Sequence, residues 1–334
     1  MSDPLALHRR LLTLDSHIDI PWPDGPRFTA ETQRRVDLPK MRRGHLTCGF
    51  FAAYVPQTRR SPDADEAAFA RAVAMLEAIR AMGAAEGARL CRTADDIEAA
   101  VADGAIAVVP AVENGHACAG DPARLRRFAE LGARYMTLTH TGHNALADSS
   151  NPRADLGDGE TEHGGLSDVG RAAIAEMNRL GMVVDISHVS KAGMLQAAAL
   201  SCTPVVATHS CVRALCDNLR NLDDEQLDAL RDVGGVVQIT AVPYFLRANA
   251  KPETTSPADF ADHVDYAVKR IGLAHVGISS DFDGGGGFAG WRDASESPAI
   301  TAELASRGYG EAELAALWGG NFLRVLRAAE AAAE

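Results

Sequence analysis

Residues 182–209 read MVVDISHVSKAGMLQAAALSCTPVVATH, and one structural unit can be recognised in this stretch. Its two ends, residues 182–188 and 204–209, are short runs of β-branched and apolar residues, as in buried strands. Between them, residues 191–200 repeat apolar side chains at intervals of three and four, as an amphipathic helix does. Strand, helix and strand in succession predict parallel pairing through a right-handed crossover.

The same alternation runs through the whole chain. Eight strand-like runs occur, at residues 11–19, 46–55, 105–113, 134–140, 182–188, 204–209, 234–240 and 275–281. Eight such units predict an α/β fold, a (β/α)8 TIM-type barrel that takes up residues 1–334 as a single domain. A doubly wound open sheet is the alternative, but the chain contains no glycine-rich nucleotide-binding motif. Residues 311–334 are expected to add helices to the outer ring of the barrel.

Composition excludes several classes of partner. The 334 residues are 46% hydrophobic and carry a formal charge of −12, which argues against nucleic acid or an anionic membrane surface as the main partner. No window approaches the roughly 20 apolar residues of a membrane helix, so we expect a cytoplasmic protein. The six cysteines are scattered, which favours reduced thiols. The oligomeric state stays open, with a homodimer as one option.

Residues that commonly bind metals stand at the carboxyl ends of six of the eight predicted strands. In barrel enzymes this rim carries the active site. The residues are His17 and Asp19, Glu113, His140, His188, His209, and Asp281 with Asp283 beside it.

Side-chain alternation predicts which residues of the fifth strand face the interior of the barrel. Val184 and Ile186 precede His188 by four and two positions, so we expect them to fill the barrel interior below the site. Asp185 has the opposite parity, and it should face the helices or lie behind the metal ligands.

The three imidazoles of His17, His188 and His209, together with the two carboxylates of Asp19 and Glu113, are too many ligands for one tetrahedral zinc that keeps a water position open. They suit two divalent ions, roughly 3.5 to 4 Å apart, that share a carboxylate. The economical division places His17 and Asp19 on one ion and His188 and His209 on the other, with Glu113 between them. Such ligands favour two Zn²⁺ ions per chain, with Mn²⁺, Co²⁺ or Fe²⁺ as substitutes.

Two such ions make hydrolysis the expected chemistry. A hydroxide held between two cations is a nucleophile at neutral pH, because the ions lower the pKa of bound water. Asp281 is placed to accept a proton from that water and to pass it to a leaving amine.

Several motifs carry a specific resemblance that covers nearly the whole chain in order. They resemble the membrane (renal) dipeptidase family of binuclear zinc peptidases. The motifs are DSHIDIPW (15–22), AVENGH (111–116), RYMTLTH (134–140), GLSDVGRAAIAEMNRLGMVVDISHVS (165–190), PVVATHS (204–210), NLRNLDDEQL (218–227) and GISSDFDG (277–284).

The resemblance implies a barrel that hydrolyses dipeptides, L-Xaa-L-Xaa and also L-Xaa-D-Xaa, with the division of metal ligands given above. It also implies that His140 contacts the substrate carbonyl and the tetrahedral intermediate. Arg220 would hold the substrate carboxylate, and Asp281 would be the acid/base. One departure is Asn114, which replaces the glycine that usually follows the bridging glutamate.

Two other functions compete with a metallo-dipeptidase. A related binuclear metallohydrolase acting on another small amide, lactam or ester would share every metal ligand but would not need Arg220. A metal-stabilised scaffold would be expected to lose Asp281 or His140, and this chain keeps both.

Overall fold

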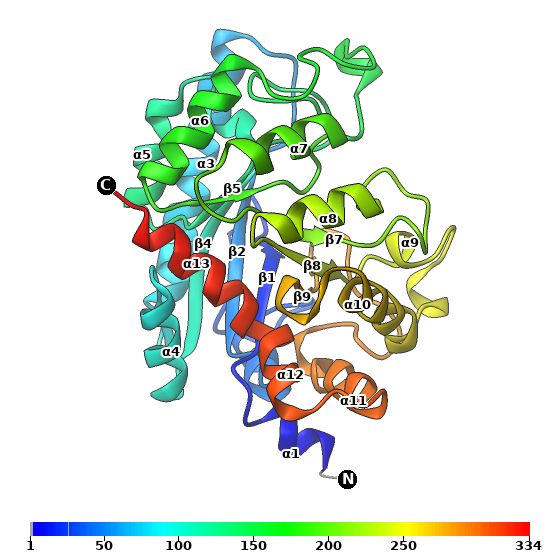
Figure 1. Ribbon diagram of the computed structural model, residues 1–334. Helices are drawn as coiled ribbons and strands as arrows, with labels where there is room; N and C mark the ends of the chain where they lie inside the picture. Colours follow the sequence, from blue (N-terminus) through cyan, green and yellow to red (C-terminus); the bar gives the residue numbers. More distant parts are fainter. Residues whose placement is uncertain (1–2, 26) are drawn as a thin grey trace.

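The computed structural model describes residues 3–25 and 27–334, and its strands form a nearly closed parallel barrel (Figure 1). The pairing order is β1-β2-β4-β5-β6-β7-β8-β9. The last strand returns to the first through a parallel bridge between Ile18 and Phe282, where the Asp19 amide donates to the Phe282 carbonyl at 3.0 Å. The predicted (β/α)8 fold is confirmed.

The strands are β1 Leu14–Asp19, β2 Cys48–Tyr54, β3 Ala88–Leu90, β4 Ile106–Glu113, β5 Tyr135–Thr137, β6 Val183–Asp185, β7 Val206–Ser210, β8 Val236–Thr240 and β9 Val276–Ser279. The α-helices are α1 Pro4–His8, α2 Leu38–Gly44, α3 Pro62–Gly83, α4 Ala94–Ala102, α5 Leu125–Glu130, α6 Asp168–Arg179, α7 Lys191–Leu200, α8 Asp224–Asp232, α9 Pro243–Leu246, α10 Pro257–Ile271, α11 Pro298–Ser306, α12 Glu311–Ala315 and α13 Asn321–Ala331. All eight predicted strands are present. The additional strand β3 pairs only with β4, and its three partly exposed residues give no apolar run to detect.

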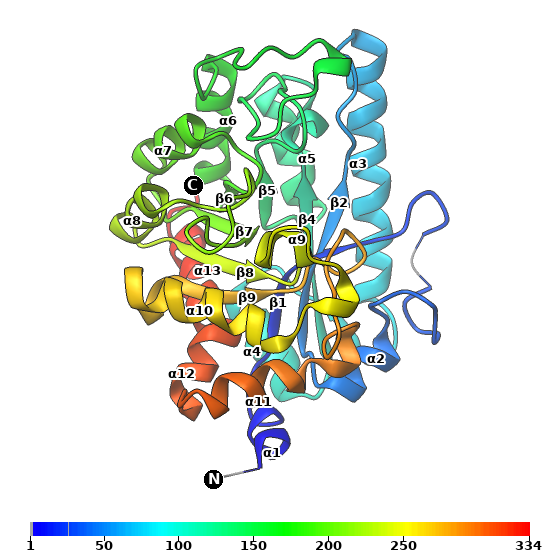
Figure 2. The same cartoon turned by 90° about the vertical axis from the view of Figure 1, so that its right-hand side faces the viewer.

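Local sequence signals start the helices of the outer layer. Ser61 precedes α3 and its side chain accepts from the Ala64 amide, while Asp223 and Gln226 form a reciprocal capping box at the start of α8. The long helix α3 lies against β2 and β4, as Figure 2 shows on the outer side of the barrel.

The C-terminal helix α13 crosses the amino-terminal end of the barrel instead of extending the outer ring. It contacts β6, β8 and β9, and the Phe322 ring packs on Phe50 of β2 with a centroid distance of 4.8 Å. This corrects the expectation for the end of the chain. Phe322 closes the end of the barrel opposite the predicted site.

The expected direction of the β6 side chains is wrong in part. Val184 and Ile186 pack with apolar residues of the surrounding helices, whereas Val183 belongs to the interior cluster that contains Tyr135. β6 ends at Asp185, and His188 has a left-handed backbone with φ 67°. Because the strand ends before His188, simple alternation does not carry its direction back to Val184.

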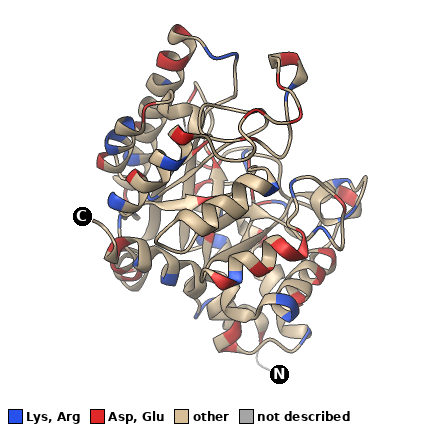
Figure 3. Ribbon diagram, turned by 45° about the horizontal axis from the view of Figure 1, so that its top comes forward, with Lys and Arg blue, Asp and Glu red and all other residues tan. Residues whose placement is uncertain are grey.

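Acidic and basic residues are interspersed along the helices in the view of Figure 3. Among the described residues, no helix is both long enough and apolar enough to span a membrane.

Candidate metal centre

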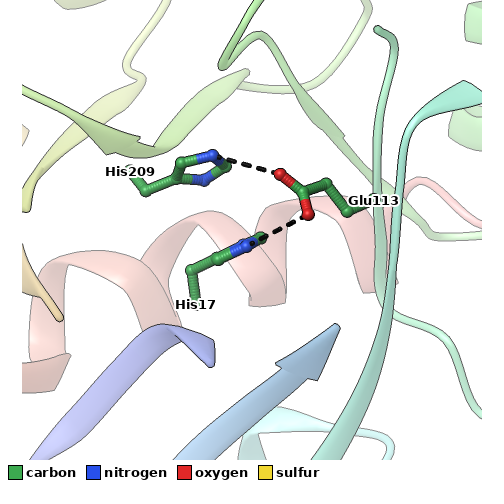
Figure 4. A group of neighbouring side chains, drawn as sticks. All are labelled: His17, Glu113 and His209. Carbon is green, nitrogen blue, oxygen red and sulfur yellow. Dashed lines mark ion pairs between the residues drawn. The ribbon is translucent and has the colours of Figure 1, made fainter. Parts of the chain in front are cut away.

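Four histidines converge on the carboxylate of Glu113, the last residue of β4. Oε1 of Glu113 lies 3.2 Å from Nε2 of His188, 3.4 Å from Nε2 of His209 and 3.6 Å from Nε2 of His140. Oε2 lies 3.6 Å from Nε2 of His17 (Figure 4). The two oxygens of one buried carboxylate therefore face different histidines.

Asp19 and Asp281 complete the cluster on the β1 side. One ligand atom from each of His17, Asp19 and Asp281 falls within a common span of 4.8 Å. The structure thus brings together all five predicted metal ligands, with His140 and Asp281 beside them.

The donor atoms of this cluster fit divalent cations. Nε2 of His17 and Oδ1 of Asp19 are buried and have no hydrogen-bond partner among the described residues. Nε2 of His188 lies 2.9 Å from Nε2 of His209, so two ring nitrogens face each other. Imidazole nitrogens and carboxylate oxygens are the ligands that zinc prefers outside thiolate sites.

The pKa shifts of the clustered side chains also favour the binding of cations. Burial, followed by the neighbouring Glu113, raises the pKa of Asp19, and burial raises the pKa of Asp281 to about 7. Burial lowers the pKa of His209 to about 3. Against the effect of burial, the neighbouring Glu113 raises the pKa of His17 to about 10. A buried cluster that raises the pKa of its carboxylates and draws a proton onto His17 lacks positive charge, which metal ions supply.

A hydrogen-bond chain behind His17 sets which of its nitrogens faces the cavity. The Tyr135 hydroxyl donates to the Ser16 carbonyl at 2.9 Å and lies 2.8 Å from Nδ1 of His17. Because that hydroxyl has a single proton, it must accept from Nδ1–H. Nε2 of His17 is then the nitrogen that faces the cluster, where a metal ion would take the place of its proton.

His209 is held in the same way from β6 and β7. The Thr208 hydroxyl donates to Oδ2 of Asp185 at 2.6 Å and lies 2.9 Å from Nδ1 of His209. Nδ1 of His209 is therefore the protonated nitrogen. Asp185 lies behind the ligands, which is one of the two positions expected for it.

Arg220 lies in the wall of an open cavity of about 740 Å³ above the cluster. Its side chain is buried, donates to the His209 carbonyl at 3.0 Å and leaves Nε without a hydrogen-bond partner among the described residues. His140 lines the same cavity, with its ring 4.7 Å from that of Tyr54 and 4.1 Å from that of His188.

Two flanking residues order the loops around the site. Asn114 has φ 81°, and its side chain bonds the Val55 carbonyl and the His116 amide, so it satisfies a backbone shape that otherwise favours glycine. Asp283 accepts from the Arg35 amide at 3.0 Å and pairs with Arg34 at 3.3 Å, which makes it a residue that orders the loop.

Sequence reasoning did not find several residues of the site. Tyr135 gave no signal, because nothing local reveals that its hydroxyl reaches a histidine from another strand. Arg71 is one position in an amphipathic helix pattern, and only the fold shows that it lines the cavity.

A barrel rim that gathers imidazoles and carboxylates beside an open cavity defines a metal-dependent hydrolase. The sequence model of the family described as membrane dipeptidase (peptidase family M19) matches residues 2–334. The chain belongs to this family, and it is a metal-dependent dipeptidase.

Individual relatives agree with this assignment. Dipeptidase aclJ of Aspergillus oryzae is 36% identical over 309 residues, covering 89% of this chain and 70% of the relative. The crystal structure of the probable dipeptidase PvdM from Pseudomonas aeruginosa has a TM-score of 0.93 at 30% identity, covering 99% of this chain and 98% of that one. A Rhodobacter sphaeroides metallopeptidase, solved with a phosphinate mimic of L-Ala-D-Ala, has a TM-score of 0.83 at 28% identity and covers 96% and 99% of the two chains.

Proposed function

We propose that this dipeptidase holds two zinc ions and hydrolyses dipeptides whose free carboxylate is bound by Arg220. The observation that carries the proposal is the position of Glu113, whose two oxygens face different histidines: Oε2 faces His17, and Oε1 faces His188 and His209. His17 and Asp19 would hold one ion, and His188 and His209 the other, with Glu113 shared. When bound, two such ions supply Lewis acidity and lower the pKa of a water between them.

The residues of the chain position the substrate and move the proton. Arg220 binds the terminal carboxylate through its planar guanidinium, which matches the two carboxylate oxygens. His140 donates to the oxygen of the scissile carbonyl as that carbon becomes tetrahedral. Asp281 accepts the proton of the attacking water and returns it to the leaving amine as the C–N bond breaks.

The carboxylate clamp explains which peptide bond is cleaved. With the carboxylate fixed at Arg220, the scissile carbonyl must lie one residue away, over the metal ligands. An amidated dipeptide lacks the carboxylate that Arg220 binds, so it should be a poor substrate. The open cavity leaves room for either configuration at the carboxyl-terminal residue, so L-Xaa-L-Xaa and L-Xaa-D-Xaa are both proposed substrates.

The test compares a dipeptide with its carboxyl-terminal amide in zinc-loaded wild type, Arg220→Lys and Arg220→Ala. Truncation to alanine should lower kcat/KM for the free acid. The loss should correspond to about 2 to 5 kcal/mol of transition-state stabilisation, because one partner of a buried charged pair is lost. Hydrolysis of the amide should hardly change.

Arg213→Ala is the matched control, since Arg213 lies in the same loop and bonds the Asn218 carbonyl but does not itself line the cavity. It should affect both substrates equally. Equal losses with Arg220→Ala would contradict the clamp and show that Arg220 supports the fold or the metals.

A further inference from the structure

The cavity wall contains two arginines that have no carboxylate partner among the described residues. One is Arg220, and the other is Arg71 of α3. A third cavity arginine, Arg34, is neutralised by Asp283, with Nε of Arg34 3.3 Å from Oδ2. Arg71 is thus a positive charge in the substrate cavity that the proposed function does not use.

The local contacts of Arg71 hold its side chain in place without neutralising it. Nε donates to the Tyr54 carbonyl at 3.1 Å, and no bond of its terminal nitrogens is found among the described residues. Burial lowers the pKa of Arg71, and the Tyr54 hydroxyl partly opposes that effect. Met75, one helical turn later, lines the cavity on the same face of α3.

The barrel topology places Arg71 opposite the clamp. In the strand order, β2 and β7 are four positions apart in a ring of eight, so they lie across the barrel from each other. Arg220 follows β7, while Arg71 is on the helix that follows β2. Tyr54, the last residue of β2, is in register with Glu113. The metal cluster therefore lies between the two arginines.

We propose that Arg71 binds an acidic side chain on the amino-terminal residue of the substrate, so that aspartyl and glutamyl dipeptides are the preferred class. This inference rests on the proposed function. A dipeptide held by Arg220 with its carbonyl at the cluster directs its amino-terminal residue toward β2 and α3. There the guanidinium of Arg71 meets the side-chain carboxylate, while Met75 and Tyr54 contact its aliphatic part.

The test uses pairs of nearly isosteric substrates that differ in charge. In zinc-loaded wild type, kcat/KM for L-Glu-L-Ala should exceed that for L-Gln-L-Ala by about ten-fold or more, as expected for a charge-assisted hydrogen bond. Arg71→Met should bring this ratio close to one, and Arg71→Lys should retain part of it. Phosphinate mimics of the two dipeptides should show the same ratio in their Kd values by calorimetry.

Arg80→Met is the control, because Arg80 is on the same helix and does not line the cavity. It should keep the wild-type ratio. A wild-type ratio near one, or a ratio that Arg71→Met leaves unchanged, overturns the subsite. If the wild type hydrolyses neither these dipeptides nor L-Ala-L-Ala, the proposed function itself fails.

Discussion

Individual side chains of this enzyme depend on partners that are remote in sequence. His17 is oriented by Tyr135 from β5. His209 is oriented by its neighbour Thr208, whose hydroxyl is fixed by donating to Asp185 of β6. Ligand histidines that donate their second N–H to a fixed acceptor bind metal better, because the ring is already in the right tautomer and direction.

Tyr135→Phe should therefore weaken zinc binding about 10- to 100-fold, since it removes only the hydroxyl that accepts from Nδ1 of His17. Competition with a chromogenic chelator measures the affinity. Tyr309→Phe is the control, because the Tyr309 hydroxyl donates to Asp265 at 2.9 Å, away from the site. Unchanged affinity in Tyr135→Phe would mean that packing alone orients His17.

Asp281→Asn should reduce kcat by about 10² to 10⁴, because it keeps the size of the side chain and removes the proton acceptor. The zinc content should remain that of the wild type. Steady-state kinetics and elemental analysis of the same preparation check both statements. A variant that loses metal but regains full activity on reconstitution would make Asp281 a ligand and not the acid/base.

At the level of elements, the ends of the strands carry the chemistry. His188 follows β6 and Asp281 follows β9, and both have left-handed backbones, with φ 67° and 55°. Such backbones are uncommon outside glycine and need support from the surrounding structure. After Asp281, the amides of Gly284, Gly285 and Gly286 all donate to its carbonyl. The turn that positions the carboxylate is thus held by its own backbone.

The buried His8 of helix α1 should make the stability of the fold depend on pH. His8 is fully buried; its Nδ1 lies 2.6 Å from the Thr301 hydroxyl of α11 and its Nε2 lies 2.9 Å from the Gly44 carbonyl. Burial lowers the pKa of His8 from 6.5 to about 4. The unfolded chain therefore binds more protons between these values, so this contribution to stability is complete above pH 6.5 and is lost as the pH falls toward 4.

Urea unfolding of metal-free wild type and His8→Gln at pH 7.5 and pH 4.5 measures this effect. The stability advantage of the wild type should shrink by about 2 to 3 kcal/mol at the lower pH. Other titrating groups are common to both proteins and cancel in the difference. An advantage of the same size at both pH values would show that His8 is not neutral in the folded protein.

For the whole molecule, the metal cluster joins strands from both halves of the chain. The proposed ligands come from β1 and β4 in the first half and from positions after β6 and within β7 in the second. Metal that binds only this assembled rim stabilises the folded state by mass action. Metal removal should therefore lower the melting temperature as well as abolish turnover.

Purified protein supplied with zinc should carry close to two ions per chain, because Glu113 offers one oxygen to His17 and the other to His188 and His209. Elemental analysis gives the count, and Zn²⁺, Mn²⁺ or Co²⁺ should restore the activity of chelated enzyme. A plateau at one ion per chain with full activity would rule out the shared carboxylate.

Most of the fold could be predicted because its signals are local. Alternation of strand and helix patterns located all eight barrel strands, and ligand-type residues at their ends marked the rim that the structure assembles. β3 escaped detection because three partly exposed residues carry no pattern. The directions of Val184 and Ile186 were wrong because β6 stops before His188.

What lies across the barrel could not be predicted from any local pattern. Tyr135 touches His17, and Arg71 shares a cavity with Arg220, only because closure of the sheet sets which strand ends face each other. Hydrophobic periodicity determines whether a segment is a strand or a helix and which of its faces is buried. The distance between two side chains far apart in sequence depends instead on strand order, tilt and loop path, which the tertiary packing alone decides.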